Sequence, residues 1–396
     1  MASAESEPSE APAASAAPLS ERANRWMQRL AGALLGVCAG GALLTCYGVA
    51  LQQGRTFEVG AALGFWVAMS VAAVAIHEFG HYLGARMTGM TVLAVAVGVV
   101  EAVPVVGGWR LQSRSPHSTS SEAGGYVIAC PDPERRSRAD SAILLLAGPL
   151  LNLCAAVVLT VATLSLPSSP WQSACLAFAL LNFAGFACNL LPYRSRTLFT
   201  DGLQLLYLRQ PRSEMEPFAV AWRLVARSYR GDTAEELPED ELRVLADHAD
   251  QLPLSHEWYR LKASQNLGQW QDVAEWEGAV NRQVAQVSDA ALAQLSRVLL
   301  PLLRAEIAFS RSMASGDAGY VEAVGLARDV QREAPYLMPR LRALAAGLRG
   351  DAARAASELE LSRQAAETSI QVALRRSEAR LRAYVQATIA TNPAAH

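Results

Sequence analysis

The sequence lacks closely paired cysteines, and this absence narrows the kinds of site that it can build. Its six cysteines all precede residue 200, and none of them forms a C-x-x-C pair. Such pairs are typical of thiolate metal sites, and regular cysteine spacings are typical of small disulfide-rich proteins. We therefore expect neither a thiolate-bound metal nor a disulfide framework.

The sequence also lacks an excess of charge of either sign. It has 35 Lys and Arg residues against 37 Asp and Glu residues, which gives a net charge of −2. Proteins that bind nucleic acid usually carry a strongly basic surface. Overall charge therefore gives no reason to expect nucleic acid as a partner.

The N-terminal segment, residues 1–20, lacks the composition of a folded segment. It is rich in Ala, Ser, Pro and Glu, which cannot bury a core. It also lacks the basic-then-apolar layout of a cleaved signal peptide. We expect a disordered tail, followed by a first hydrophobic run that is retained as a membrane helix.

Long hydrophobic runs are abundant in the first half of the chain. Hydrophobic residues make up 51% of the sequence and the mean hydropathy is +0.14, which is high for a soluble protein of this length. A helix needs about 20 apolar residues to cross a bilayer. Four runs are long enough, and they lie at about residues 28–51, 60–85, 141–166 and 171–192. The sequence predicts a mainly α-helical, multi-pass membrane protein.

Arginines are distributed unevenly around these four runs. They gather before the first run, between the second and third, and after the fourth, whereas the opposite loops carry only Arg55. Basic residues are enriched in cytoplasmic loops. We therefore expect both termini to be cytoplasmic, with a bacterial cell membrane as the expected location.

The segment between the second and third runs has a different pattern. Residues 91–111 are rich in β-branched side chains and are interrupted by Glu101 and Pro104, so a fifth membrane helix is a poor interpretation. Gly107-Gly108 can turn a hairpin. We expect a small sheet at the membrane surface, followed by residues 124–127. An exposed edge of this sheet would need a partner in lipid, and a substrate strand could be that partner.

The second hydrophobic run contains the motif His77-Glu78-Phe79-Gly80-His81. Residues four apart share one face of a helix, so both imidazoles can bind one metal ion. Glu78 can take a proton from water whose pKa a zinc ion has lowered to about 7. Such polar residues are costly inside a bilayer, which favours a metal site over a polar cluster between helices.

A catalytic zinc site needs a third protein ligand and an open position. The acidic candidates are Glu101, Asp132, Asp140 and Asp201, and His117 lies in a Ser-rich loop. Asp201 stands out because it follows the fourth run, where a broken helix could bring it back towards the histidines.

Four motifs, in this order, resemble the site-2 protease family of intramembrane zinc proteases. They are the histidine motif, Gly124-Gly125-Tyr126-Val127, Gly148-Pro149-Leu150-Leu151-Asn152, and Asn189-Leu190-Leu191-Pro192 leading to Asp201-Gly202. The resemblance covers about residues 60–206. It implies that His77, His81 and Asp201 bind zinc and that Glu78 is the general base. It also implies that Asn152 and Asn189 support the substrate, and a structural amide at a helix end is the alternative for each.

The rest of the chain has no run that could span a membrane. Trp258–Ala279 and residues 319–366 look like helix pairs and loosely resemble tetratricopeptide repeats, with an ordinary helical bundle as the alternative. We expect a tail at 1–20, a membrane metalloprotease domain at 21–210, and a cytoplasmic helical domain at 214–396. A helical array of this kind could dock a substrate or an adaptor.

Together these features predict a zinc-dependent endopeptidase that cuts membrane-embedded or membrane-associated proteins or peptides within or beside the lipid bilayer. One alternative is a non-catalytic membrane scaffold with a structural zinc site and a partner-docking helical domain. Glu78 argues against it, because a structural site needs no base. A second alternative is a metal transporter, which is disfavoured because the candidate ligands form one compact pattern rather than a series across the bilayer.

Overall fold

A computed structural model of the chain describes residues 19–52, 58–114, 124–135, 138–194, 199–210 and 216–391. The chain divides into two compact units. The first unit consists of Met1–Ala102, Leu111–Ala129 and Ser137–Pro211, and the second of Val103–Arg110, Cys130–Arg136 and Arg212–His396. The tail expected at residues 1–20 lies outside the described residues, apart from its last two.

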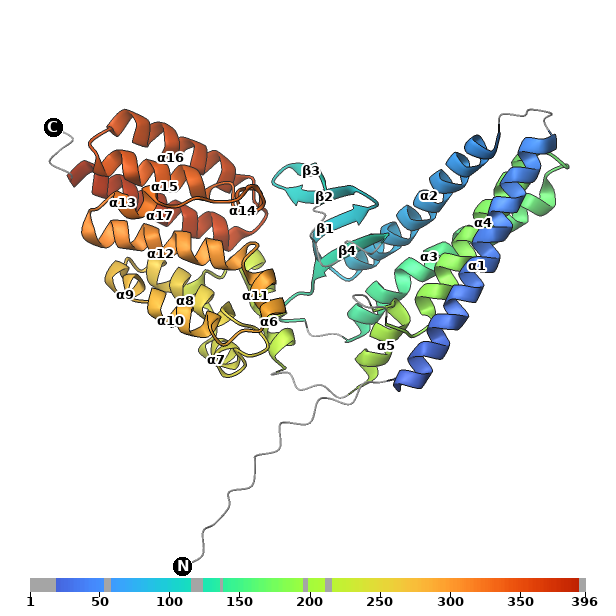
Figure 1. Cartoon of the computed structure of the whole chain (residues 1–396), viewed down its shortest axis with the longest axis horizontal. Helices are drawn as coiled ribbons and strands as arrows, with labels where there is room; N and C mark the ends of the chain where they lie inside the picture. Colours follow the sequence, from blue (N-terminus) through green and yellow to red (C-terminus); the bar gives the residue numbers. More distant parts are fainter. Residues whose placement is uncertain are drawn as a thin grey trace, which may run out of the picture. The chain divides into compact units, whose positions relative to one another are not determined.

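Four long apolar helices make up most of the first unit (Figure 1). They are α1 (Glu21–Gln52), α2 (Glu58–Met87), α3 (Arg138–Ser165) and α4 (Pro170–Leu190), and the short helix α5 (Asp201–Arg209) follows them. Each of the four contains a stretch that is long and apolar enough to cross a membrane. The four predicted spans are therefore confirmed.

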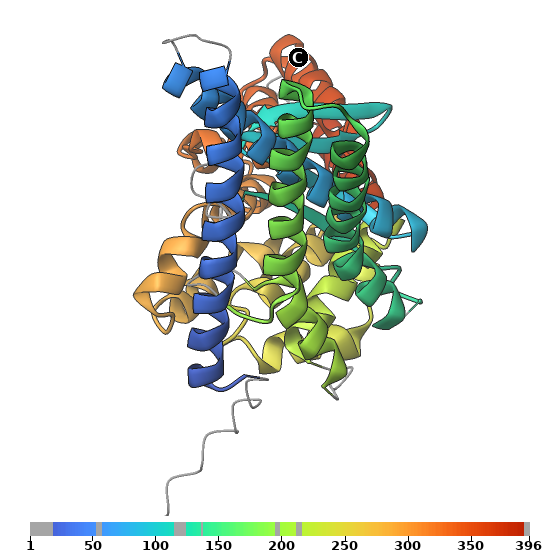
Figure 2. The same ribbon diagram turned by 90° about the vertical axis from the view of Figure 1, so that its right-hand side faces the viewer.

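The four helices pack as neighbours in the order α2, α3, α4 and α1. Figure 2 shows α1, α4 and α3 side by side. The contact between α2 and α3 depends on glycine: a Cβ at Gly80 would overlap the backbone of Ala147 and Gly148, and one at Gly84 would lie 2.8 Å from the Ala147 side chain. Small residues let helix backbones approach closely in lipid. This packing places the histidine motif of α2 directly against α3.

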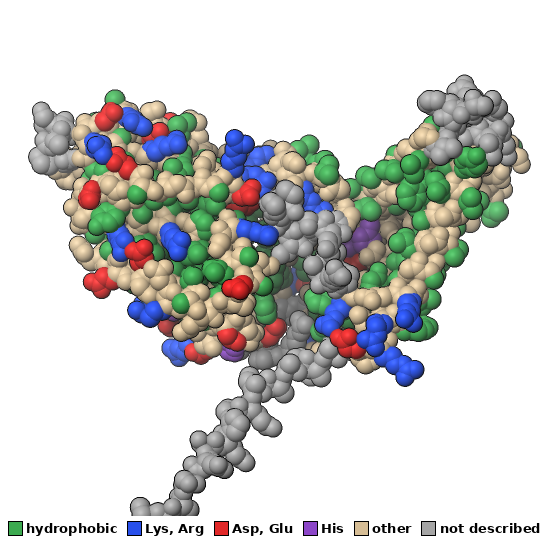
Figure 3. All heavy atoms as spheres, in the orientation of Figure 1, with side chains coloured by type: hydrophobic (Ala, Val, Ile, Leu, Met, Phe, Trp, Pro, Cys, Tyr) green, Lys and Arg blue, Asp and Glu red, His purple; other side chains and the backbone are tan. Residues whose placement is uncertain are grey.

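The start of α1 and the segment after α4 lie at the same end of this bundle. The Arg194 guanidinium is 3.0 Å from the Glu21 carboxylate, and the Arg194 backbone N–H donates to the Asn24 side chain over 2.8 Å. Figure 3 shows basic side chains gathered at this end, while the flanks of the membrane helices are largely apolar. The arginine-containing segments before the first span and after the fourth span therefore lie at the same end of the bundle.

A small sheet connects α2 to α3. Its strands are β1 (Thr91–Val97), β2 (Val100–Val105), β3 (Gly108–Ser113) and β4 (Gly125–Cys130), in the spatial order β3-β2-β1-β4. β1 and β2 are antiparallel, with Val95 opposite Ala102. Gly107, in the turn between β2 and β3, has a φ of +87°, which favours glycine. The predicted β element is confirmed, and β4 forms one edge of it.

The C-terminal part of the second unit is helical, as predicted. Its elements are α6 (Pro217–Arg230), a 3₁₀ turn (Ala234–Glu236), α7 (Glu239–Asp247), α8 (Ser255–Asn266), α9 (Trp270–Ala274), α10 (Glu277–Val284), α11 (Asp289–Leu295), α12 (Leu299–Ser315), α13 (Gly319–Glu322), α14 (Arg328–Glu333), α15 (Leu337–Leu348), α16 (Ala352–Glu367) and α17 (Val372–Thr391). Phe309, Leu337, Leu344 and Leu381 are fully buried at the centre of its largest apolar cluster. The resemblance of these helices to tetratricopeptide repeats stays a prediction.

Candidate metal centre

Helix α2 presents the two imidazoles of the motif on one face. The Nε2 atoms of His77 and His81 are 3.0 Å apart, and both side chains are buried. His81 Nδ1 lies 2.7 Å from the Leu144 carbonyl oxygen, so we assign its N–H to that hydrogen bond. A histidine that donates through Nδ1 keeps the lone pair of Nε2 available for a metal ion.

Asp201 approaches both histidines from the start of α5. Its Oδ2 lies 3.2 Å from His77 Nε2 and 3.4 Å from His81 Nε2. The preceding residue, Thr200, fixes this geometry: its hydroxyl donates to the Leu191 carbonyl over 2.7 Å and accepts the N–H of α5 at Leu203. The start of α5 is therefore tied to the end of α4, although the chain between them is long.

Gly202 allows α5 to begin so close to α4. A Cβ at this position would overlap the carbonyl group of Leu190. The glycine directly after Asp201 is therefore required for packing, because any side chain there would push α5 away from α4.

We expect Gly202→Ala to displace Asp201 from the histidines and to weaken zinc binding. A loss of at least about tenfold in zinc affinity is expected, which is the lower range seen when groups that orient metal ligands are removed. Chelator competition on the purified protein measures this affinity. Gly36→Ala on α1 is the matched control, because a Cβ there meets no atom within 4 Å. Unchanged affinity in Gly202→Ala would contradict the role given to this glycine.

The three ligand atoms fit a zinc ion. They all lie within 4.8 Å of one another, and the distances between them are 3.0 to 3.4 Å. Ligands about 2.0–2.1 Å from a tetrahedral zinc ion are about 3.4 Å apart. Two imidazole nitrogens and one carboxylate oxygen are also a donor set that suits zinc, and three protein ligands leave a fourth position for a reactant.

The other candidate ligands lie outside this group. Glu101 accepts hydrogen bonds from two side chains of the sheet, at 2.5 and 2.7 Å. Asp132 forms an ion pair with an arginine of α6. Asp140 is in the first turn of α3 and is not a member of the three-residue group. His117 lies outside the described residues.

Glu78 is buried beside the edge strand of the sheet. It is 6% exposed. Gly125, the first residue of β4, packs against it, and a Cβ at Gly125 would lie 2.6 Å from Glu78 Cγ and 2.8 Å from Oε1. The start of β4 and the carboxylate are therefore in direct contact, and only glycine fits at this point of the strand.

Asn152 and Asn189 occupy different positions relative to the histidines. Asn152 is buried, and its side-chain amide lies 3.4 Å from His77 Nδ1. Rotating that amide by half a turn puts its oxygen in place to accept the Nδ1–H of His77. Asn189 donates to the Gly185 carbonyl of its own helix over 2.8 Å. This hydrogen bond fits the alternative interpretation of Asn189 as a structural amide near a helix end. A substrate role for either amide stays a prediction.

Two buried polar residues of the first unit were not found by sequence reasoning. Arg114, directly after β3, is 9% exposed, and its guanidinium lies 4.8 Å from the centre of the Tyr126 ring. It also donates to the Gly98 carbonyl over 3.3 Å. Asn182 is fully buried in α4. Arg114 gave no signal because the segment around it is rich in Ser and Arg, as exposed loops are.

Comparison with known proteins gives one match. The family model of peptidase family M50 matches residues 64–302, which is more than half of the 396 residues. The match begins in α2 and ends in α12, so it includes His77, Glu78, His81 and Asp201. No curated protein and no solved structure matches the chain.

Proposed function

Because this chain belongs to peptidase family M50 and is a membrane metalloprotease, we propose that it uses zinc to cut peptide bonds of membrane-embedded or membrane-associated substrates. The convergence of His77, His81 and Asp201 next to the buried Glu78 is the observation that supports this most directly. The family match also confirms the resemblance to the site-2 protease family. Together with four apolar helices, it makes the chain an integral membrane protein.

We propose that each polar residue of the centre has one role. When bound, zinc acts as a Lewis acid and lowers the pKa of water to about 7. Glu78 takes a proton from the attacking water and delivers it to the leaving amine. The Leu144 carbonyl fixes the ring of His81, and Asn152 fixes the ring of His77. Burial of these groups supports the proposal, because it holds them in one geometry before substrate arrives.

We propose that the substrate binds as an extended segment along β4. β4 is the edge strand next to β1, and its first residue, Gly125, touches Glu78. An edge strand offers backbone donors and acceptors to an added strand. A helical substrate shields its carbonyl groups, so it must unwind before it can pair. Such pairing would bring an unwound backbone to the general base.

We propose that both termini are cytoplasmic, as the arginine distribution predicts. The arginine-rich start of α1 and the segment after α4 share one end of the bundle, which supports this orientation. His77 lies 17 residues after Gly60, the start of the second span, and therefore about 26 Å along it. The proposed zinc site is then close to the cytoplasmic side, from which water would enter.

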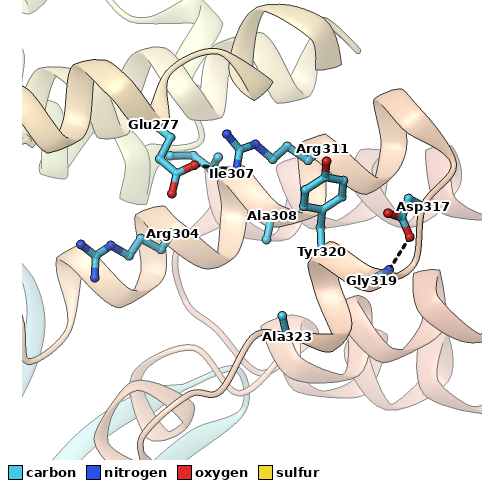
Figure 4. A pocket seen from close by; sticks show the side chains of 9 residues that line it. All are labelled: Glu277, Arg304, Ile307, Ala308, Arg311, Asp317, Gly319, Tyr320 and Ala323. Carbon is cyan, nitrogen blue, oxygen red and sulfur yellow. Dashed lines mark hydrogen bonds and ion pairs between the residues drawn. The ribbon is translucent and has the colours of Figure 1, made fainter.

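We propose that the helical C-terminal part docks a substrate or an adaptor. Its surface has a groove of about 430 Å³ along α12 and α13 (Figure 4). Arg304, Ala308 and Arg311 line it from one face of α12, and Tyr320 lines it from α13. Arginines beside small and aromatic residues suit an extended peptide with an acidic side chain. Two carboxylates, Glu277 at 2.5 Å from Arg311 and Asp317, also line the groove and offset the charge of the two arginines.

The test of this function is metal-dependent cleavage in reconstituted vesicles. The purified chain is mixed with membrane proteins of its source cells, and new peptide ends are identified by mass spectrometry. We expect cleavage to stop after chelation and to return with about one zinc ion per chain. Cleavage that persists without metal would contradict the proposed mechanism. A chain that keeps zinc but cuts nothing would favour the scaffold alternative.

A further inference from the structure

The last residue of the edge strand that touches Glu78 belongs to the second unit. β4 runs from Gly125 to Cys130, and Cys130 belongs to the second unit. Its thiol is almost fully buried, and this burial raises its pKa to about 12. Cys130 is 1% exposed, so the end of β4 is enclosed within this unit.

The residues directly after β4 form ion pairs with the end of α6. Arg230, the last residue of α6, lies 3.0 Å from the Asp132 carboxylate and 3.3 Å from the Glu134 carboxylate. These side chains are partly exposed, so each pair is weak by itself. One guanidinium therefore lies between two carboxylates where the chain leaves β4.

The β2–β3 hairpin has a second attachment to the same helices. Val105, the last residue of β2, pairs antiparallel with Ser369 in the turn between α16 and α17. The next residue, Val106, donates its backbone N–H to the Thr368 carbonyl over 2.9 Å. These residues all belong to the second unit. The hairpin turn and the end of β4 are thus both in contact with helices of the second unit, to which they belong.

We propose that the C-terminal helices are a positioning element for the proteolytic site, because they hold this sheet at two points and thereby keep Gly125 against Glu78. The inference rests on the proposed function. Six strand residues span about 20 Å, and a hydrogen-bonded strand is stiff, so a shift at Cys130 is passed along β4 to Gly125. A ligand of the helices that loosens either attachment then lowers the rate of proteolysis.

A disulfide tests the attachment at the hairpin. Antiparallel partners have Cα atoms about 4.5–5.5 Å apart, which is within the range of disulfides. We expect the full-length chain with Val105→Cys and Ser369→Cys to cross-link under mild oxidation. Val105→Cys combined with Glu322→Cys on α13 is the control and should not cross-link. If the first pair fails to cross-link, the helices do not hold the hairpin and the proposal is overturned.

Charge reversal tests the attachment at β4. Arg230→Glu places like charges beside Asp132 and Glu134, so we expect kcat to fall about threefold to tenfold while zinc content is unchanged. In a background where Cys130 is the only cysteine, its alkylation by maleimide should become faster. Adding Asp132→Arg restores opposite charges and should recover most of the rate. Arg349→Glu, which breaks the exposed pair with Glu322, is the matched control and should keep the wild-type rate.

The outcomes separate this inference from the proposed function. A wild-type kcat in Arg230→Glu, despite faster alkylation of Cys130, would show that the position of the sheet does not govern catalysis. A lowered rate that the Asp132→Arg exchange does not recover would equally count against positioning. If the wild-type chain cuts no substrate, the proposed function fails. In that case cross-linking of Val105→Cys with Ser369→Cys and alkylation of Cys130, which need no proteolysis, still decide whether the helices hold the hairpin and the end of β4.

Discussion

Replacing Glu78 with Gln is expected to abolish cleavage while zinc stays bound. Gln has nearly the same shape as Glu, so it can fill the buried position beside Gly125 without rearrangement. Unlike Glu, it cannot accept a proton from water. Removing a general base typically costs 10²–10⁴ in rate. We therefore expect a loss of at least about 100-fold in kcat. Product formation in vesicles and zinc analysis of the same sample measure both quantities.

Glu101→Gln is the matched control for this variant. Glu101 is a partly buried carboxylate of the sheet, and it accepts hydrogen bonds from Tyr126 and Gln112. We expect its replacement to change kcat far less than replacement of Glu78, because it is not in the metal group. If Glu78→Gln cut at the wild-type rate, or if Glu101→Gln were the inactive variant, the general base would be wrongly assigned.

Replacing Asp201 with Ala is expected to remove both zinc and activity. His77 and His81 come from a single helix, so Asp201 is the ligand that closes the site from α5. Losing an outer partner of a ligand costs about 10–100-fold in zinc affinity, and we expect loss of the ligand itself to cost more. Zinc measured after gel filtration, together with kcat, should fall close to background.

Ligand exchange gives the control for this second variant. Asp201→His keeps a donor that zinc accepts, so we expect it to retain more zinc than Asp201→Ala. His248→Ala should leave zinc content unchanged, because that imidazole bonds to the Val244 carbonyl on α7 and is not a member of the metal group. Full zinc occupancy in Asp201→Ala would mean that another residue completes the site.

Much of this architecture was predictable because it follows from strong local patterns. Span length and apolar content predict α1 to α4, and a four-residue spacing predicts that His77 and His81 share a face of α2. Pro104 and Glu101 within a β-branched run predict strands rather than a fifth helix. Each of these patterns is read within one segment, where helix and strand geometry alone decide the outcome.

The parts that sequence reasoning missed depend on contacts between distant segments. Nothing near Gly125 in the sequence shows that Glu78 packs on it, and nothing near Asn152 shows that its amide faces His77. Asp201 was selected by its place after the fourth run, but the packing of Gly202 on Leu190 that carries it inward appears only in the fold. Such pairs leave no periodic signal in a single sequence.

In the second unit, too, contacts between distant segments could not be predicted from the sequence. Its helices were predictable from periodicity, but the attachment of the β2–β3 hairpin to the turn at Ser369 joins segments more than 250 residues apart. Backbone pairing of this kind needs no particular side chain, so composition cannot reveal it. The boundaries predicted at 1–20, 21–210 and 214–396 stay predictions. The second unit also includes two segments that lie within 21–210, Val103–Arg110 and Cys130–Arg136.

X-ray absorption at the zinc edge of the purified chain tests the central claim most directly, because it reports ligand type and distance without a substrate. Two imidazole nitrogens and a carboxylate oxygen should give a first shell of nitrogen and oxygen at about 2.0–2.1 Å, with imidazole scattering beyond it. The chain also has six cysteines. A sulfur shell at about 2.3 Å, or zinc that stays bound after both His77 and His81 are replaced, would contradict the assignment.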